Sequence, residues 1–196
     1  MNITVRYYNY EYDFPSKNVP EWSSLVERWY QVDTQSYGIA SFYWDNKKNL
    51  NTPNLIMLAS NCACYQSDLA FIKTLSPSKF VYTLPNVMSS TLCQVSKWNG
   101  PILCIQNGLD SFRTAILEAI IWNIKNNGCI WVFNSNQITD SKYSIELIEV
   151  KKEDITKDNL ADKELLSYKN FYNLNYNEIK NLFTSTTNKK IILKMD

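Results

Sequence analysis

Residues 100–119 have the sequence GPILCIQNGLDSFRTAILEA, and this stretch decides the expected fold. The apolar run from Pro101 to Ile105 is typical of a short buried strand, and Gln106-Asn107-Gly108 supplies a tight turn. Asp110 or Ser111 can then cap a helix, because either side chain can accept hydrogen bonds from the free amides of the first turn. The pattern predicts a strand, a turn and a helix in that order.

The helix that follows the turn is apolar on nearly every side. Such a helix belongs inside a protein, packed on more than one face. A second buried strand is expected at Cys129–Phe133, after Gly128. Together these elements predict an α/β protein with a buried central helix, although strand, turn and helix alone also fit an ordinary α/β core unit. The apolar positions of the helix are Ala115, Ile116, Leu117, Ala119, Ile120, Ile121, Trp122 and Ile124.

Further elements are expected on both sides of this unit. Periodicity predicts strands at Ile3–Tyr12, Leu55–Ser60 and Ile145–Val150, the last one half-exposed. It also predicts an amphipathic helix at Glu21–Gln31, a short helix at Asp68–Leu75 and one helix within Glu164–Phe183.

The order and spacing of these elements resemble the N-terminal half of β-ketoacyl synthases, across about residues 54–135. The chain is more specifically similar to the short, ketosynthase-like chain length factors of aryl polyene and related polyketide gene clusters. This resemblance implies a truncated thiolase-like fold with a mixed sheet. We expect residues 1–150 to form the ketosynthase-like domain and residues 151–196 to be a helical extension of it. The residues that carry the resemblance are Phe80, Pro85, Asn86, Gly100, Pro101, Gly108 and Leu117-Glu118-Ala119.

The resemblance also locates the nucleophile of a condensing enzyme. That cysteine follows the Gly-Pro proline by eight positions, where a helix N-terminus lowers its pKa, and the corresponding residue here is Leu109. A leucine side chain cannot accept an acyl group. Condensation also needs histidines from the C-terminal half of a full synthase, and this chain contains no histidine. We therefore expect no catalytic residue and a non-catalytic subunit.

The five cysteines offer no substitute nucleophile and no metal site. Cys104 lies within the expected strand, where apolar neighbours would raise its thiol pKa. Cys62 and Cys64 are separated by one residue, while Cys93 and Cys129 stand alone, so the spacing of a zinc site is missing. An odd number of cysteines without a secretion signal predicts reduced thiols in the cytoplasm.

Composition excludes several classes of function. The chain has 196 residues and a formal net charge of +1, which favours neither nucleic acid nor anionic lipid. No apolar run reaches the roughly twenty residues that cross a bilayer, so an intracellular, cytoplasmic protein is expected. Without a glycine-rich phosphate loop, no nucleotide or other cofactor is expected. Arg6 and Arg28 lie among aromatic residues, but basic residues are too sparse for a nucleic-acid surface.

By resemblance, the partner is a full-length β-ketoacyl synthase, and the heterodimer engages acyl carrier protein indirectly. Ketosynthases dimerise through the strand before the nucleophile, so the same strand and turn are expected to form the interface here. The silent subunit then delimits the partner's acyl channel, with Met88, Leu109 and Phe112 as the expected wall. The expected interface residues are Pro101, Ile102, Leu103, Cys104, Ile105, Asn107 and Phe112.

Two alternatives remain open at this stage. One is a free-standing acyl-thioester enzyme that uses Asp110 or Glu118 as a base, although the lack of histidine disfavours it. The other is a homodimeric scaffold or a docking module for acyl carrier protein, which needs the same apolar strand as the heterodimer does.

Overall fold

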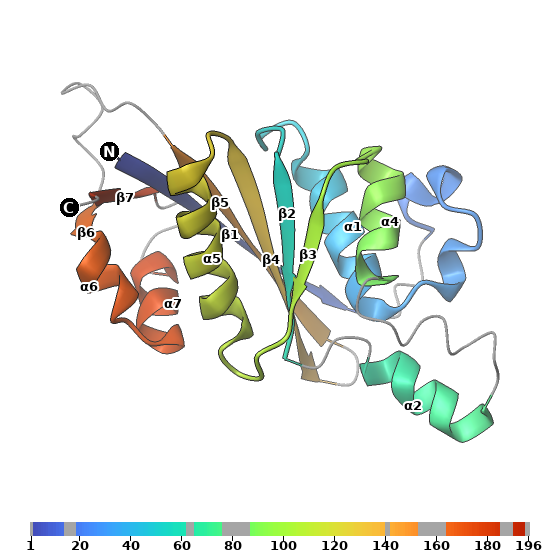
Figure 1. Cartoon of the computed structure of the whole chain (residues 1–196). Coiled ribbons are helices and arrows are strands. Elements are labelled where there is room, and N and C mark those ends of the chain that lie inside the picture. Colours follow the sequence, from blue (N-terminus) through green and yellow to red (C-terminus); the bar gives the residue numbers. More distant parts are fainter. Residues whose placement is uncertain are drawn as a thin grey trace.

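The strands of the described part of the chain pair into one seven-stranded sheet with the order β3-β2-β4-β5-β1-β7-β6 (Figure 1). This computed structural model describes residues 2–13, 19–61, 65–75, 87–139, 142–152, 164–184 and 190–194. The strands are β1 (Asn2–Asp13), β2 (Leu55–Ala59), β3 (Ile102–Ile105), β4 (Cys129–Thr139), β5 (Lys142–Lys152), β6 (Glu164–Ser167) and β7 (Lys190–Lys194).

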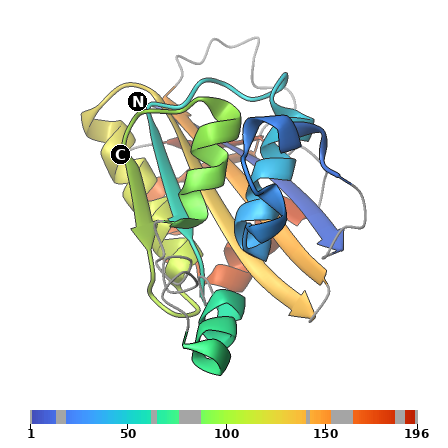
Figure 2. The same ribbon diagram turned by 90° about the vertical axis from the view of Figure 1, so that its right-hand side faces the viewer.

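Helices cover both faces of the sheet, which gives three layers (Figure 1). One face carries α5 (Ser111–Lys125), α6 (Tyr168–Tyr172) and α7 (Tyr176–Thr184). The other face carries α1 (Thr34–Asn46) and α4 (Val87–Ser96). Figure 2 views the molecule from the α1–α4 side and shows α2 (Tyr65–Thr74) below the sheet and β3 at its outer edge.

Strand directions define two edges of the sheet. β2 is parallel to both β3 and β4, with Ala59 opposite Ile105 on one side and Asn134 on the other. We call the end at which these strands finish the carboxyl edge, and the end at which they begin the amino edge. From β4 through β5 and β1 to β7, each strand is antiparallel to the next one in the sheet. β6 is parallel to β7. The turn into α5 lies at the carboxyl edge.

Side chains alternate between two hydrophobic cores, one on each face of the sheet. Met57, Val132 and Ile148 pack with α5, α6 and α7. Their sequence neighbours Ile56 and Leu147 pack with α1 and α4 on the opposite face. Because both faces are covered, the central strands are nearly continuous runs of apolar residues rather than alternating ones.

Most of the expected strands are confirmed. β1, β2, β4 and β5 contain the segments predicted at residues 3–12, 55–60, 129–133 and 145–150, within one residue at the ends. The expectation that the fourth of these is half-exposed is wrong, because residues 145–150 are all buried between the two helical layers. Among the described residues, no helix is long and apolar enough to cross a membrane.

The amphipathic helix predicted at Glu21–Gln31 is replaced by two short 3-10 helices, η1 (Glu21–Leu25) and η2 (Trp29–Gln31). Arg28 between them has a φ of 59°, which interrupts a right-handed helix. Trp22 anchors the segment, since it is 1% exposed and its Nε1 donates to Ser41 Oγ at 3.0 Å. The apolar face foreseen from the sequence is real, but it packs on α1 and α4 without a continuous helix.

The C-terminal extension is only partly helical. The single helix predicted within Glu164–Phe183 is instead a strand, β6, followed by the two helices α6 and α7. Ser167 caps α6, since its Oγ accepts from Asn170 N at 3.2 Å. β7 then inserts between β1 and β6, so the extension adds two strands to the same sheet.

Candidate functional site

The turn that joins β3 to α5 is closed by the hydroxyl of Ser111. This hydroxyl accepts from Asn107 N at 2.7 Å and donates to Gly108 O at 2.7 Å. Gly108 has a φ of 55°, in the left-handed region that favours glycine. Of the two caps proposed from the sequence, Asp110 holds the cap position without a side-chain cap bond, and Ser111 fixes the turn. The result is a defined loop at the N-terminus of α5.

Leu109 lies at the tip of this turn, where the sequence placed the degenerate nucleophile position. It is the most exposed large apolar side chain among the described residues, at 81%. A hydrocarbon side chain here offers no nucleophile and no proton donor or acceptor. An exposed leucine is nevertheless well suited to contact another protein surface.

β3 is an edge strand, paired with β2 on one side only in the described structure. The expectation of a buried strand is therefore wrong, because Leu103 is 49% exposed and Cys104 is also exposed. Ile102 and Ile105 are half-buried and touch the two cores, and Pro101 is exposed. An exposed apolar edge strand presents side chains that another protein surface can cover.

The helix α5 is less enclosed than its composition predicted. Its inner side is buried on the sheet, while Glu118 and Ile124 are exposed and Ile121 and Trp122 are half-buried. Arg113 ties the start of α5 to the C-terminal helices, since its Nε donates to Leu174 O at 2.7 Å and its guanidinium also donates to Tyr172 O at 2.8 Å. The apolar outer side of α5 thus remains partly open.

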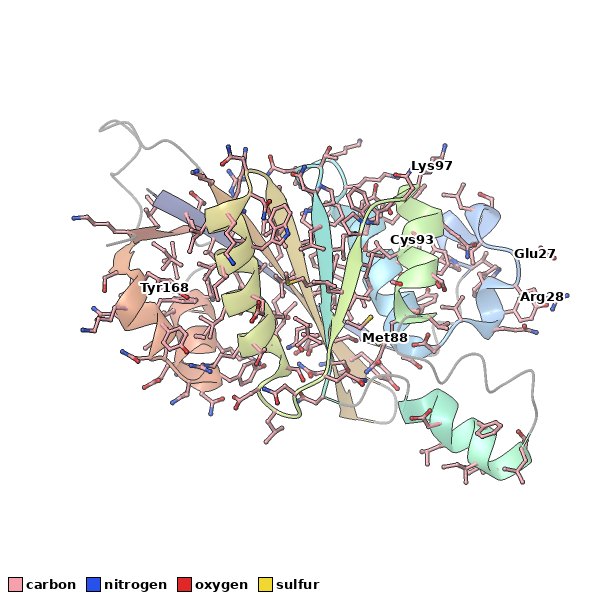
Figure 3. All side chains as sticks on the ribbon, in the orientation of Figure 1. Glu27, Arg28, Met88, Cys93, Lys97 and Tyr168 are labelled. Atoms are coloured by element: carbon pink, nitrogen blue, oxygen red, sulfur yellow. The ribbon has the colours of Figure 1, made fainter. Side chains whose placement is uncertain are left out.

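The three residues predicted to form the channel wall do not lie together. Met88 is 1% exposed and packs between α1, α4 and the sheet (Figure 3). Phe112 is 2% exposed on the opposite face, where its ring meets Tyr176 edge-on at a centroid distance of 6.2 Å. Only Leu109 projects from the surface. Asn107, another predicted interface residue, is exposed in the same turn and donates from Nδ2 to Thr114 Oγ1 at 3.1 Å.

The described thiols lack the low pKa of a catalytic cysteine. Burial raises the pKa of Cys93 and Cys104, and for Cys104 this desolvation acts although part of the residue is exposed. Burial and the neighbouring Glu149 carboxylate raise the pKa of Cys129 to about 12. Cys62 and Cys64, like the resemblance residues Phe80, Pro85 and Asn86, lie outside the described residues. No group of three or more metal-ligating side chains occurs in the described ranges.

A buried carboxylate at the sheet face below α7 was missed by the sequence analysis. Glu146 is 1% exposed, and its carboxylate accepts from Tyr7 OH at 2.6 Å and Asn134 Nδ2 at 2.6 Å. Tyr176 OH lies 3.4 Å away and Lys180 Nζ 3.8 Å away, both on α7. Burial, and then the carboxylate, raise the pKa of both tyrosines, so they remain proton donors. The Tyr176 bond fastens α7 to the sheet, and the Tyr7 bond joins β1 to β5.

A second buried carboxylate, Glu149, occupies the opposite face. Its oxygens accept from Asn51 N at 2.8 Å, Trp131 Nε1 at 3.3 Å and Tyr8 OH at 3.1 Å. The segment IELIEV was expected to alternate as a half-exposed strand does, but its two glutamates are three positions apart and therefore point to opposite faces of the sheet. The sequence signal for their burial is the pair Tyr7 and Tyr8 on β1, each of which lies two positions along the strand from the residue opposite its glutamate.

The mixed sheet, its two helical layers and the turn that leads into α5 define an α/β protein with a thiolase-like, ketosynthase-like fold. Among solved structures, the chain is similar to one in the complex of the ketosynthase ApeO with its chain length factor ApeC from Xenorhabdus doucetiae, with a TM-score of 0.54 and 13% identity. The alignment covers 63% of this chain and 59% of that chain. The fold expected from the sequence is thereby confirmed. No protein family and no curated protein matches the sequence.

Proposed function

We propose that this protein is a non-catalytic ketosynthase-like subunit that pairs with a full-length β-ketoacyl synthase and shapes its acyl channel. The observation that carries the proposal is Leu109, an exposed hydrocarbon side chain on the turn where the ketosynthase resemblance requires a cysteine. The chain contains no histidine, and every described thiol has a raised pKa. The chain can therefore contribute to chain elongation only by binding a partner.

The exposed apolar side chains at the β3 edge support the pairing. Leu103 exposes about half of its surface on this edge, and the helix α5, which contacts β3, exposes Ile124. Covering this edge with a partner removes apolar surface from water. The predicted interface residues on β3 are consistent with such a contact, while Phe112 acts indirectly by holding α5 on the core.

The structure also refines the proposed channel contact. Met88 and Phe112 are buried in separate cores, so neither side chain is available to a partner without unfolding its surroundings. Leu109 alone protrudes, and we assign the steric role to it. This subunit would then act on product length by pressing one apolar side chain toward the partner's acyl chain.

The proposal is tested by co-producing the chain with a full-length β-ketoacyl synthase and measuring whether the two co-purify in a stable complex. Leu103→Lys places a charge in the proposed interface and should abolish co-purification. Tyr30→Lys is the matched control, because Tyr30 is 68% exposed on η2 and lies on the outer side of the α1–α4 layer. Equal behaviour of the two variants would refute pairing through β3.

A homodimeric scaffold is the second candidate, and the same exposed edge favours it. Two copies of β3 can pair antiparallel about a two-fold axis, as symmetric dimers commonly do. The molar mass of the purified chain alone, and then of the chain mixed with the β-ketoacyl synthase, separates the two. A dimer that persists on mixing supports the scaffold, whereas a monomer or dimer that converts to a heterodimer supports the proposed function.

A further inference from the structure

A polar pocket lies at the amino edge, at the opposite end of the sheet from the turn that holds Leu109. Its volume is about 510 Å³, within the range of small-molecule sites. The loop before β2, the start of β4 and the end of β5 form it. The lining residues used below are Asn51, Asn54, Asn127, Gly128, Lys151 and Lys152.

Two hydrogen bonds hold together the segments before β2 and at the start of β4, which line the pocket. Asn54 N donates to Cys129 O at 2.6 Å, and Cys129 N donates to Asn54 Oδ1 at 2.9 Å. Gly128 is required between them, because a Cβ at this position would overlap the Asn54 side chain. Asn123 of α5 donates to Gly128 O at 2.9 Å from behind. These hydrogen bonds fix the segments that line the pocket, so the pocket is preformed.

The charge of the pocket is positive. Lys151 and Lys152 line it, and no carboxylate of the described residues forms an ion pair with either lysine. Glu149, which accepts from the lining residue Asn51, is 1% exposed, and Tyr8, Trp131 and Cys129 also donate hydrogen bonds to it. Arg6 does not line the pocket but lies opposite Glu149 in the adjacent strand, where its positive charge opposes that of the carboxylate. The charged side chains on the lining itself are both lysines.

The lining also determines what kind of molecule fits. Side-chain amides of Asn51, Asn54 and Asn127 and two ammonium groups supply the polar part of the lining, and Thr52 adds a hydroxyl. Such a surface binds an apolar ligand poorly, since entry would strip water from polar groups without replacing their hydrogen bonds. Lysine is well suited to phosphate as a compact positive charge with three donors.

We propose that the amino-edge pocket binds a small phosphorylated molecule, with its phosphate paired to Lys151 and Lys152 and its remaining polar groups bonded to the asparagine amides. This site is separate from the proposed pairing through β3, because none of its lining residues lies on β3. It would give the subunit a ligand-binding function that requires no partner protein.

The test is a titration of the purified chain with inorganic pyrophosphate at constant ionic strength, followed by amide chemical shifts. We expect saturable shifts at Asn127, Gly128 and Lys151. The double variant Lys151→Gln/Lys152→Gln should bind at least about tenfold more weakly, as expected for the loss of charge-assisted bonds. Lys73→Gln/Lys169→Gln, on α2 and α6, removes the same charge elsewhere and should bind normally. Shifts that do not saturate, or equal weakening in both double variants, would overturn the proposal.

Discussion

Leu109 and Phe112 are three positions apart, yet Leu109 is 81% exposed and Phe112 is 2% exposed. The left-handed backbone of Gly108 and the Ser111 hydroxyl turn the chain sharply at this point. As a result, Leu109 projects from the carboxyl edge while Phe112 enters the core below α7. Both residues were predicted to form the channel wall, but only Leu109 is accessible to a partner, whereas Phe112 packs in the core.

This difference has a direct consequence for stability. Phe112→Ala removes a buried ring, so we expect the free energy of unfolding to fall by about 3–5 kcal/mol. Leu109→Ala removes an exposed side chain and should change it by less than about 0.5 kcal/mol. Urea denaturation of the two variants measures both values. A large loss for Leu109→Ala would contradict its exposed position.

Product length is expected to depend on Leu109. Co-produced with the β-ketoacyl synthase, Leu109→Ala should lengthen the products because the channel gains room, and Leu109→Trp should shorten them. Mass spectrometry of the released chains records the distribution. Tyr30→Ala serves as the control and should leave the distribution as in the wild type. An identical distribution of product lengths in all four proteins would contradict the steric role of Leu109.

Much of the fold could be predicted because the apolar segments are long and distinct. The turn at residues 106–108 and the strands around it follow from local chemistry. The burial of Glu146 could not be predicted, because it depends on α7 and β1, which are distant in sequence and meet only in the folded chain. The exposure of Leu103 could not be predicted either, because it depends on β3 lying at the edge of the sheet, and periodicity does not specify the order of the strands.

A cysteine introduced at the tip of the turn should have a reactive thiol, because the ketosynthase resemblance places the nucleophile at this position. We expect the new thiol of Leu109→Cys to be alkylated by iodoacetamide faster at neutral pH than Cys104, because the N-terminus of α5 favours the thiolate while burial raises the pKa of Cys104. Peptide mass spectrometry over a pH series gives both rates. Without histidine the variant should still not condense acyl groups. Slower alkylation of the introduced thiol than of Cys104 would contradict the assigned helix-terminus environment.

Alkaline pH should destabilise the fold around Glu146, to which Tyr7 and Tyr176 donate. Burial raises the pKa values of Tyr7 and Tyr176 above the ordinary value of 10.0, so the folded state retains protons that the unfolded state releases. Their stabilisation is complete below pH 10 and is lost as the pH rises further. Urea denaturation from about pH 8 to about pH 11 should show a shallower loss for Tyr7→Phe than for wild type. Tyr30→Phe should keep the wild-type slope, and equal slopes in all three would contradict this account.

Amide hydrogen exchange across β3 tests the central claim most directly, with the unmodified chain measured alone and mixed with a full-length β-ketoacyl synthase. Pairing through the free edge predicts slower exchange at residues 102–105 in the mixture and little change in α6 and α7. Unchanged exchange in β3, whether no complex forms or the two proteins associate elsewhere, would contradict the claim that this edge is the site of partnership.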